Sequence, residues 1–345
     1  MKSKLTIVGG VPTPIGGVTT FILRLILKWP SKIRIVFDLY PSNDKVFVPV
    51  PHVILGSFGL LKLFVKFLFS VSGPVYFNFS GVRGLIFLAS LPKVGKTTWA
   101  ITLHNGNLTR KSWVENMFMR RGLEKCEHVG VLSPKQERFF LSLGARKSTL
   151  QKISSFIPRN PDEIPDIDVS ELPEFFSWQE QEAKIFIVSG YPTKIYQHTE
   201  VFETFERLWN KGLTDVRLAA FLYGEDSDDL LNDLKCKFAD SPFACLYWGK
   251  KELVFLSALK ECSGYIRMNM VDSFGVAVAE AISFGKPVLA SNVCERFSGA
   301  RLVDPSDTDS VERFVIDVCS NQFERIPVQK CQKSVETFIT TILDN

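Results

Sequence analysis

Short apolar runs alternate with amphipathic stretches along the whole chain. The runs have the length of buried strands, and the stretches between them repeat apolar positions every three or four residues, as helices do. The pattern predicts strands at 4–8, 33–38, 74–78, 98–103, 128–132, 153–157, 184–189, 215–222, 243–247, 264–268 and 288–290. It predicts helices at 18–28, 58–70, from about 134, and at 198–210, 225–237, 250–260, 276–282, 308–319 and 329–343. Alternating strands and helices predict an α/β protein with parallel sheets and right-handed crossovers.

The pattern also divides the chain into two domains. Residues 158–173 are rich in Pro and Asp and show little periodicity, which is typical of a linker or a surface loop. Strand and helix signals begin again after them. Since 345 residues are enough for two hydrophobic cores, we predict domains at 1–160 and 161–330, followed by a helical segment at 331–345.

Composition excludes several classes of protein. Hydrophobic residues make up 46% of the chain, which excludes a disordered protein. The seven cysteines form no Cys-x-x-Cys pair, and their odd number argues against a disulfide framework or a zinc site. A reducing cytoplasm is the simplest expectation, and the apolar run that begins at Leu5 is too short for a signal peptide.

The net charge of +4 conceals an asymmetry between the two halves. Residues 1–160 contain 23 Lys and Arg against 6 Asp and Glu, whereas residues 161–345 contain 18 against 31. A basic half suits anionic lipid, pyrophosphate or nucleic acid. We favour a membrane or lipid-pyrophosphate partner over the alternative, attraction between the two halves, because salt screens charges at a distance. No nucleic-acid-binding module is recognisable, so no nucleic acid is expected.

The most informative stretch is 272–291, where Glu280 lies in an otherwise almost wholly apolar segment. The segment 276–282 is apolar on every face and predicts a buried helix, which Gly285 and Pro287 end. A buried carboxylate needs partners, and ligand hydroxyls would serve. Asp272 lies just before the helix start, where backbone amides suit a phosphate. Carboxylates can accept hydrogen bonds from sugar hydroxyls, and backbone amides can bind a diphosphate. The two together suit a nucleotide-sugar.

This stretch resembles the signature of the retaining glycosyltransferases of family 4, which have the GT-B architecture. Their signature is Glu, seven residues, Glu, within Glu-Gly-Phe-Gly…Glu-Ala…Gly-Pro-Val. The chain has Asp272-Ser-Phe-Gly, Glu280-Ala and Gly285-Lys-Pro-Val, so the spacing is kept and the first acid is Asp. The resemblance implies two Rossmann-like domains whose parallel sheets face a central cleft. It assigns the acceptor to residues 1–160 and the donor to 161–330, and implies that 331–345 packs back on the first domain.

The resemblance also assigns roles in the second domain. Glu280 would bind the ribose hydroxyls, and Asp272 the hydroxyls of the transferred sugar. The backbone of Ser273, Phe274 and Gly275 would bind the diphosphate. The family has Gly-Arg after the first strand of this domain, but this chain has Tyr191, with Lys194 early by about two positions. Lys194, otherwise a solvated loop lysine, and Arg267 at a strand end are the two candidate cations.

Two features of the first half resemble the family's donor-facing loops. The glycine pairs Gly9-Gly10 and Gly16-Gly17 follow the first strand. The family brings such backbone close to the donor, and Gly16 and Gly17 are therefore expected in the site. The alternative is a tight turn that needs positive φ. His104 ends a strand where the family has a His-Gly turn facing the donor sugar and acceptor, so we expect it to be catalytic with Asp272 and Glu280.

Two segments of the first half combine apolar and basic residues. The segment 58–70 is too short and too interrupted to span a bilayer. It is either an interfacial amphipathic helix or a buried helix whose lysines reach solvent. A second such patch is formed by Trp113, Met117, Phe118 and Met119 beside Arg120-Arg121. Both favour a lipid-linked acceptor and peripheral contact with an anionic membrane.

The sequence therefore predicts a hexosyl- or related glycosyltransferase that transfers a sugar with retention. Its donor would be a UDP- or GDP-linked sugar, with no cofactor and no metal, because the family needs no obligatory metal. The acceptor would be a lipid-linked saccharide or an oligosaccharide at the cytoplasmic face of the cell membrane. Polysaccharide, lipopolysaccharide or O-antigen assembly would be the context. The alternative is a non-catalytic GT-B subunit or a partner of another transferase, which Tyr191 in place of Arg favours.

Overall fold

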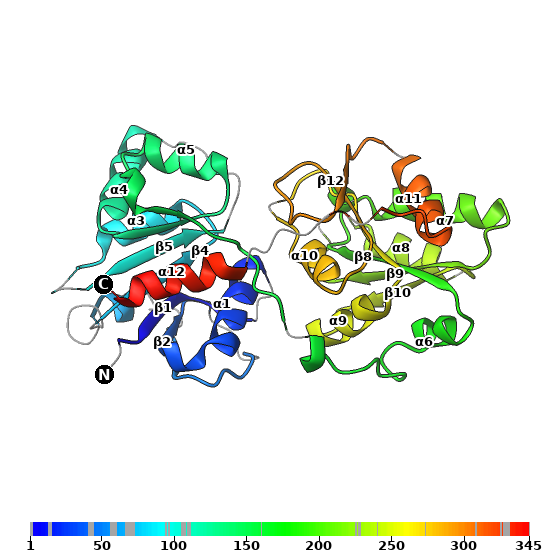
Figure 1. Cartoon of the computed structure of the whole chain (residues 1–345), viewed down its shortest axis with the longest axis horizontal. Helices are drawn as coiled ribbons and strands as arrows, with labels where there is room; N and C mark the ends of the chain where they lie inside the picture. Colours follow the sequence, from blue (N-terminus) through cyan, green and yellow to red (C-terminus); the bar gives the residue numbers. More distant parts are fainter. Residues whose placement is uncertain are drawn as a thin grey trace. The chain divides into compact units, whose positions relative to one another are not determined.

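The computed structural model describes residues 3–344, except 13–15, 41–44, 56–60, 66–72, 94, 96, 105–107, 109–111, 160, 225, 227–228, 240, 273, 308, 325 and 327–331. The chain divides into two compact units, which we call unit 1 (1–157 with 330–345) and unit 2 (158–329). Each unit has its own parallel sheet with helices on both faces (Figure 1). Within the described ranges, no helix has both the length and the apolar character needed to cross a bilayer.

The sheet of unit 1 contains seven described strands in the order β3-β2-β1-β4-β5-β6-β7, and every neighbouring pair is parallel. The strands are β1 (Leu5–Gly9), β2 (Ile33–Asp38), β3 (His52–Ile54), β4 (Val75–Phe79), β5 (Trp99–Leu103), β6 (His128–Val131) and β7 (Leu150–Lys152). The helices are α1 (Gly17–Lys28), α3 (Arg83–Ser90), α4 (Trp113–Glu124), α5 (Pro134–Ser142) and α12 (Gln332–Asp344).

Two hydrophobic layers cover the two faces of this sheet. On one face, α1 and the C-terminal helix α12 pack together, with Phe338 and Ile342 of α12 in the same core as Ile22 of α1 (Figure 1). On the other face, α3, α4 and α5 form a second core. Helices α3 and α4 approach closely because Gly122 lacks a side chain: a Cβ there would lie 2.0 Å from the carbonyl oxygen of Leu85.

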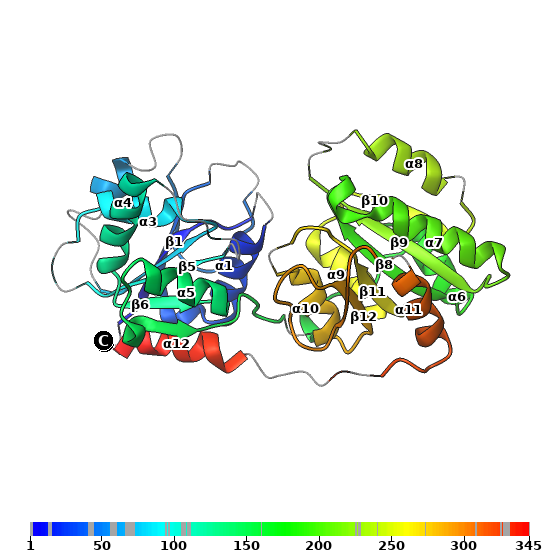
Figure 2. The same cartoon turned by 90° about the horizontal axis from the view of Figure 1, so that it is seen from above.

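The sheet of unit 2 contains six described strands in the order β10-β9-β8-β11-β12-β13, again all parallel. The strands are β8 (Lys184–Gly190), β9 (Val216–Leu222), β10 (Ala244–Trp248), β11 (Gly264–Arg267), β12 (Val288–Ser291) and β13 (Arg301–Val303). The helices are α6 (Pro173–Glu180), α7 (His198–Asn210), α8 (Leu231–Ala239), α9 (Glu252–Glu261), α10 (Val276–Ser283) and α11 (Asp309–Cys319). Helices α6, α9 and α10 pack on one face, and α7, α8 and α11 on the other (Figure 2).

The strand order identifies where each sheet can bind a ligand. In unit 1, β1 to β3 follow one another toward one edge of the sheet, and β4 to β7 follow one another toward the other edge. In unit 2, β8 to β10 run toward one edge and β11 to β13 toward the other. Open α/β sheets bind ligands beyond the carboxyl ends of the strands at such a switch point. The residues to inspect are therefore those that follow β1 and β4 in unit 1 and β8 and β11 in unit 2.

Most predicted strands and helices are confirmed, and 33–38 and 198–210 have the predicted bounds. The strand predicted at 153–157 is wrong, because the last strand of unit 1 is β7 at 150–152. The Ser154 hydroxyl accepts the Phe156 amide, which turns the chain away from the sheet. Helix α8 begins six residues later than predicted, because the Asp226 carboxylate accepts the amides of Leu230 and Leu231.

Some predicted segments lie partly outside the described residues. Of the helix predicted at 58–70, residues 61–65 are described and are helical. Leu63 is fully buried, whereas Leu61 is 64% exposed and Val65 is 47% exposed, so the described part has both a buried and an exposed apolar face.

Candidate functional site

The switch point of unit 2 brings three charged side chains together. Arg267 is the last residue of β11, and its Nε donates to Oδ2 of Asp272 over 2.6 Å. The same Oδ2 accepts a hydrogen bond from Nη1 of Arg296 over 2.5 Å. Arg296 lies in the segment that follows β12. We call Arg267, Asp272 and Arg296 the arginine–aspartate cluster.

Backbone and hydroxyl groups at the ends of three strands hold this cluster in place. Arg296 donates through Nε to the carbonyl of Ser291 and through Nη2 to its hydroxyl, both over 3.0 Å. That hydroxyl in turn donates to the carbonyl of Asn269. Arg267 donates to the carbonyl of Ser189 at the end of β8, over 3.4 Å. The two guanidinium groups are therefore fixed by β8, β11 and β12 together.

The cluster is buried and carries more positive than negative charge. The side chains of Arg267, Asp272 and Arg296 are 8%, 9% and 1% exposed. Burial alone would raise the pKa of Asp272, but the charges and hydrogen bonds of the two arginines outweigh it and hold that pKa at about 2. Asp272 is therefore ionised at neutral pH, and two guanidinium charges face one carboxylate.

The loop from Asp272 to α10 shows why glycine occupies position 275. Gly275 precedes α10 with φ of +76°, a conformation that residues with a side chain rarely adopt. A Cβ at this position would also lie 2.4 Å from Nη1 of Arg296. The carbonyl of the neighbouring Phe274 accepts a hydrogen bond from Arg296 over 3.3 Å. Arg267, Asp272, Phe274 and Gly275 are thus brought together, while Ser273 lies outside the described residues.

Glu280 lies about one turn into α10 and is 2% exposed. The predicted buried helix at 276–282 is confirmed, as is the glycine that ends it, since Gly285 has a φ of +72°. The helix neighbours of Glu280 on both sides, Ala279 and Ala281, are fully buried. Burying a carboxylate is costly unless other groups interact with it.

Aromatic rings fill the position where the resemblance expects an arginine. The ring of Tyr191 lies 5.8 Å from that of Tyr196 and 5.2 Å from that of Tyr223. Tyr196 in turn lies under the guanidinium of Arg267, 5.3 Å from the ring centre. At position 191 the loop after β8 therefore contributes an aromatic ring rather than a cation, and Gly224 leaves room for this ring.

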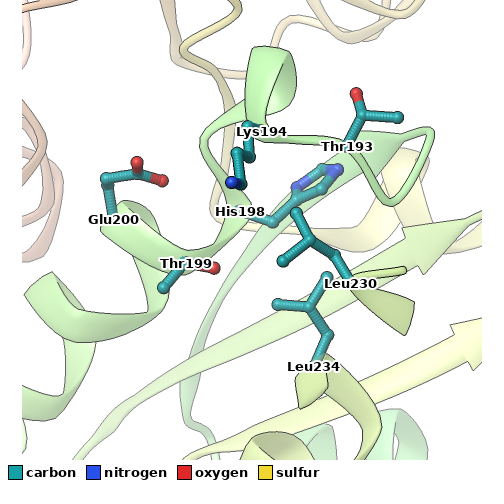
Figure 3. Close-up of a pocket in the computed structure, with 7 residues that line it drawn as sticks. All are labelled: Thr193, Lys194, His198, Thr199, Glu200, Leu230 and Leu234. Carbon is teal, nitrogen blue, oxygen red and sulfur yellow. The ribbon is translucent and has the colours of Figure 1, made fainter. Parts of the chain in front are cut away.

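The second candidate cation, Lys194, lines a pocket of about 250 Å³ (Figure 3). Its other walls come from α7 and the start of α8, and none of them belongs to the arginine–aspartate cluster. The lining residues are Thr193, Lys194, His198, Thr199, Glu200, Leu230 and Leu234. Between the two candidates, Arg267 is the one that lies beside Asp272 and α10.

The glycines of the first loop differ in what surrounds them. Gly10 is packed, since a Cβ there would lie 2.1 Å from the ring of Tyr40. Gly17 has no atom within 4 Å of a Cβ position, and Gly16 has only the Thr19 hydroxyl at 3.9 Å. None of Gly9, Gly10, Gly16 and Gly17 has a positive φ, so the alternative of a turn that needs positive φ is wrong.

His104 follows β5 at the carboxyl edge of the sheet of unit 1. Its Nε2 lies 3.1 Å from Oδ1 of Asn78 on β4, and its ring packs 4.7 Å from Phe21 of α1. Burial lowers the pKa of His104 to about 3, so it is neutral at physiological pH. A neutral imidazole there can donate or accept a hydrogen bond but brings no charge.

Sequence reasoning missed a buried acid in unit 1. Asp38, at the end of β2, accepts hydrogen bonds from the amides of Val11 and Tyr40, and its Oδ2 lies 3.0 Å from both Lys45 Nζ and His52 Nε2. We call Asp38, Lys45 and His52 the Asp38 cluster. It ties the first glycine loop to β2 and β3. Asp38 is the last residue of β2, and Ser291, which contacts Arg296, is the last residue of β12. Examining the residue at the end of every strand would therefore have found Asp38 and Ser291.

Comparisons with known proteins find similar solved structures but no matching family or curated protein. A scan against models of protein families found no match, and a search of curated proteins found none either. Among solved structures, the chain is similar to Anabaena HepE in complex with UDP, with 12% identity, a TM-score of 0.65, and coverage of 99% of this chain and 94% of that one. It is similar to the UDP-forming α,α-trehalose-phosphate synthase of Burkholderia xenovorans in complex with glucose-6-phosphate, with 12% identity, a TM-score of 0.66, and coverage of 98% and 97%.

A third similar structure is the sucrose-phosphate synthase of Thermosynechococcus elongatus, with 12% identity, a TM-score of 0.63, and coverage of 99% of this chain and 95% of that one. All three similarities extend over both units. Together with the two parallel sheets and their helices, they show that this chain has the two-domain GT-B fold.

Proposed function

We propose that this protein is a glycosyltransferase that moves a hexosyl or related sugar from a nucleotide-sugar to an acceptor, with retention of configuration. One observation supports this most: the cationic arginine–aspartate cluster adjoins the start of α10, and the same helix buries Glu280. The GT-B fold is consistent with it, and two of the similar structures are named for UDP or for a UDP-forming reaction.

In this proposal, Glu280 accepts hydrogen bonds from the ribose, and the segment 273–275 with the nearby cations binds the diphosphate. The UDP or GDP moiety leaves as the bond between the anomeric carbon and the phosphate oxygen breaks. An acceptor oxygen forms the new bond, and its proton passes to the departing phosphate. Neutral His104, with the open backbone of Gly16 and Gly17, would contact the transferred sugar. No metal or cofactor is assigned a role.

Thermal-shift measurements with UDP-, GDP- and ADP-sugars test the donor. A ligand at a hundred times its Kd stabilises the folded protein by about 2.7 kcal/mol, so one donor should raise the melting temperature well above the others. Glu280→Gln should abolish most of this shift. Glu261→Gln is the matched control, because Glu261 ends α9 in the same unit and is exposed. Equal shifts in both variants would remove Glu280 from the site.

We further propose a lipid-linked acceptor at the cytoplasmic face of the membrane, as in surface-polysaccharide assembly. Helix α4 supports this, because four large apolar residues of it are exposed, from 37% for Met117 to 78% for Trp113. Arg120 and Arg121 follow them and are exposed as well. An apolar face with basic residues suits an anionic lipid surface. Flotation with anionic vesicles should recover the protein, and Trp113→Ser should reduce recovery more than Leu141→Ser on α5, which is 39% exposed.

A second candidate function is a non-catalytic GT-B subunit. The packing of Tyr191 favours it, because the loop after β8 presents aromatic rings where a transferase of the resembled family has an arginine. A radiolabelled nucleotide-sugar distinguishes the two functions. Binding without hydrolysis or transfer to any lipid acceptor would favour the subunit.

A further inference from the structure

The arginine–aspartate cluster has a charge balance that its own residues do not satisfy. Two guanidinium groups, which remain charged at any physiological pH, share one carboxylate oxygen. The phenols of Tyr265 and Tyr223 also lie near Arg267. Burial raises the pKa of Tyr223 further, so this phenol is uncharged. A buried excess of positive charge is unfavourable without a counter-anion.

The position of this excess charge is informative. Arg267 ends β11 at the switch point, and Nη1 of Arg296 lies against Gly275, the residue that precedes α10. The amino end of α10 adds the partial positive charge of its free amides. Guanidinium N–H groups are strong donors to phosphate oxygens. Arg267 donates through Nε and Nη1 in the hydrogen bonds described above, and Arg296 through Nε, Nη1 and Nη2. A diphosphate between the two arginines and this helix would supply the missing negative charge.

In this arrangement Asp272 contacts the two arginines, whereas its place in the family signature suggests that it binds hydroxyls of the transferred sugar. Its Oδ2 already accepts a hydrogen bond from each arginine, which fixes their relative orientation. The Ser291 carbonyl and hydroxyl fix Arg296 from the other side. Oδ2 of Asp272 is therefore engaged with the two cations.

We propose that Arg267 and Arg296 bind the donor diphosphate in this protein, and that Asp272 is a positioning residue for the two arginines rather than a ligand of the transferred sugar. This inference rests on the proposed function for the identity of the diphosphate. The alternative is an ion cluster that only holds the ends of β11 and β12 together.

Calorimetry on the full chain with UDP, GDP, ADP and inorganic pyrophosphate separates these possibilities. Arg267→Gln and Arg296→Gln should each weaken nucleoside diphosphate and pyrophosphate binding by roughly tenfold to a hundredfold. Nucleoside binding should not change, and affinity should depend less on salt. Arg301→Gln, which removes an arginine paired with Asp317 in the same unit, should leave all affinities unchanged. Wild-type affinity for diphosphate in folded Gln variants would overturn the proposal.

Asp272→Asn tests the second half of the proposal. If Asp272 positions the arginines, the affinities for the nucleoside diphosphate and for the matching nucleotide-sugar change by the same factor. A loss confined to the nucleotide-sugar, with diphosphate affinity unchanged, would restore Asp272 as a sugar ligand and overturn its role as a positioning residue.

The wild-type protein supplies a measurement that does not depend on the folding of the variants. Cys294 is half-buried and interacts electrostatically with all three members of the cluster, whereas Cys236 on α8 is exposed. A bound diphosphate should slow alkylation of Cys294 at least threefold and leave Cys236 unchanged. Equal rates with and without a saturating diphosphate would count against the site.

The outcomes also separate this inference from the proposed function. Pyrophosphate binding that depends on the two arginines, with no binding of any nucleotide, would support the inference and refute the nucleotide-sugar donor. Nucleotide binding that depends on Glu280 but not on the arginines would support the nucleotide-sugar donor and refute the role of the two arginines.

Discussion

The two units place a buried aspartate at the same edge of the same kind of sheet, yet surround it with a different charge balance. In unit 1, Asp38 is fully buried and is met by Lys45, His52 and two backbone amides. In unit 2, Asp272 is met by two arginines. In unit 1 the negative charge of Asp38 is balanced by the positive charge of Lys45, so no ligand is needed to balance it. The arrangement in unit 2 leaves a positive charge, which the proposed diphosphate would balance.

The largest expected effect comes from breaking the Asp38 cluster. Asp38→Ala would leave Lys45, whose side chain is 6% exposed, without its carboxylate. Removing one partner of a buried pair costs about 3–5 kcal/mol, which denaturant unfolding followed by circular dichroism should detect. Asp317→Ala, which breaks a half-exposed pair with Arg301, should cost about 1 kcal/mol or less. Pyrophosphate should stabilise Asp38→Ala, whose two arginines are still held by Asp272, more than Asp272→Ala, which lacks their positioning residue, and equal responses would remove the contrast between the two aspartates.

The next largest effect concerns one glycine in each unit, Gly275 and Gly17. Gly275→Ala places a side chain at positive φ and against Arg296, and should reduce the free energy of unfolding by about 1–3 kcal/mol. Gly17→Ala meets open space and should change it by less than about 0.5 kcal/mol. If the Gly17 backbone approaches the donor, this variant will still raise KM. Equal destabilisation of both variants in thermal melts would contradict the structure.

The last comparison concerns one buried histidine in each unit, and its size depends on pH. Burial lowers the pKa of His104 to about 3 and that of His198 to about 4. Both values lie below the unfolded value near 6.5, so the unfolded chain binds these protons first and stability falls as pH falls. Below pH 6.5 each histidine should cost about 1.4 kcal/mol per pH unit until its folded pKa is reached. His198→Gln should flatten the pH dependence between 6 and 4.5, and an unchanged slope would exclude His198 as its source.

Local sequence pattern was sufficient for most of the architecture. Apolar runs such as 33–38 and the helical repeat at 198–210 gave the observed bounds, because the side chains that make these elements also bury them. The strand predicted at 153–157 failed because a hydroxyl of Ser154 redirects the chain, and hydrophobic periodicity does not detect such a hydrogen bond. Helix α3 was not predicted.

Part of the candidate site could be predicted from the sequence in the same way. Asp272, Gly275 and Glu280 follow one another at a fixed spacing within a single loop and helix, so the sequence alone identified them. It also identified Arg267 as a charged residue at the end of an apolar strand.

Only the tertiary structure revealed which of these residues are partners. Arg296 is 24 residues from Asp272 and on a different strand connection, and it meets Asp272 because β11 and β12 are neighbours in the sheet. The sequence by itself thus determined the elements and the acids they carry, since both depend on local spacing. Charge balance depends on distances between strand ends, and those were decided by the folding of the sheet.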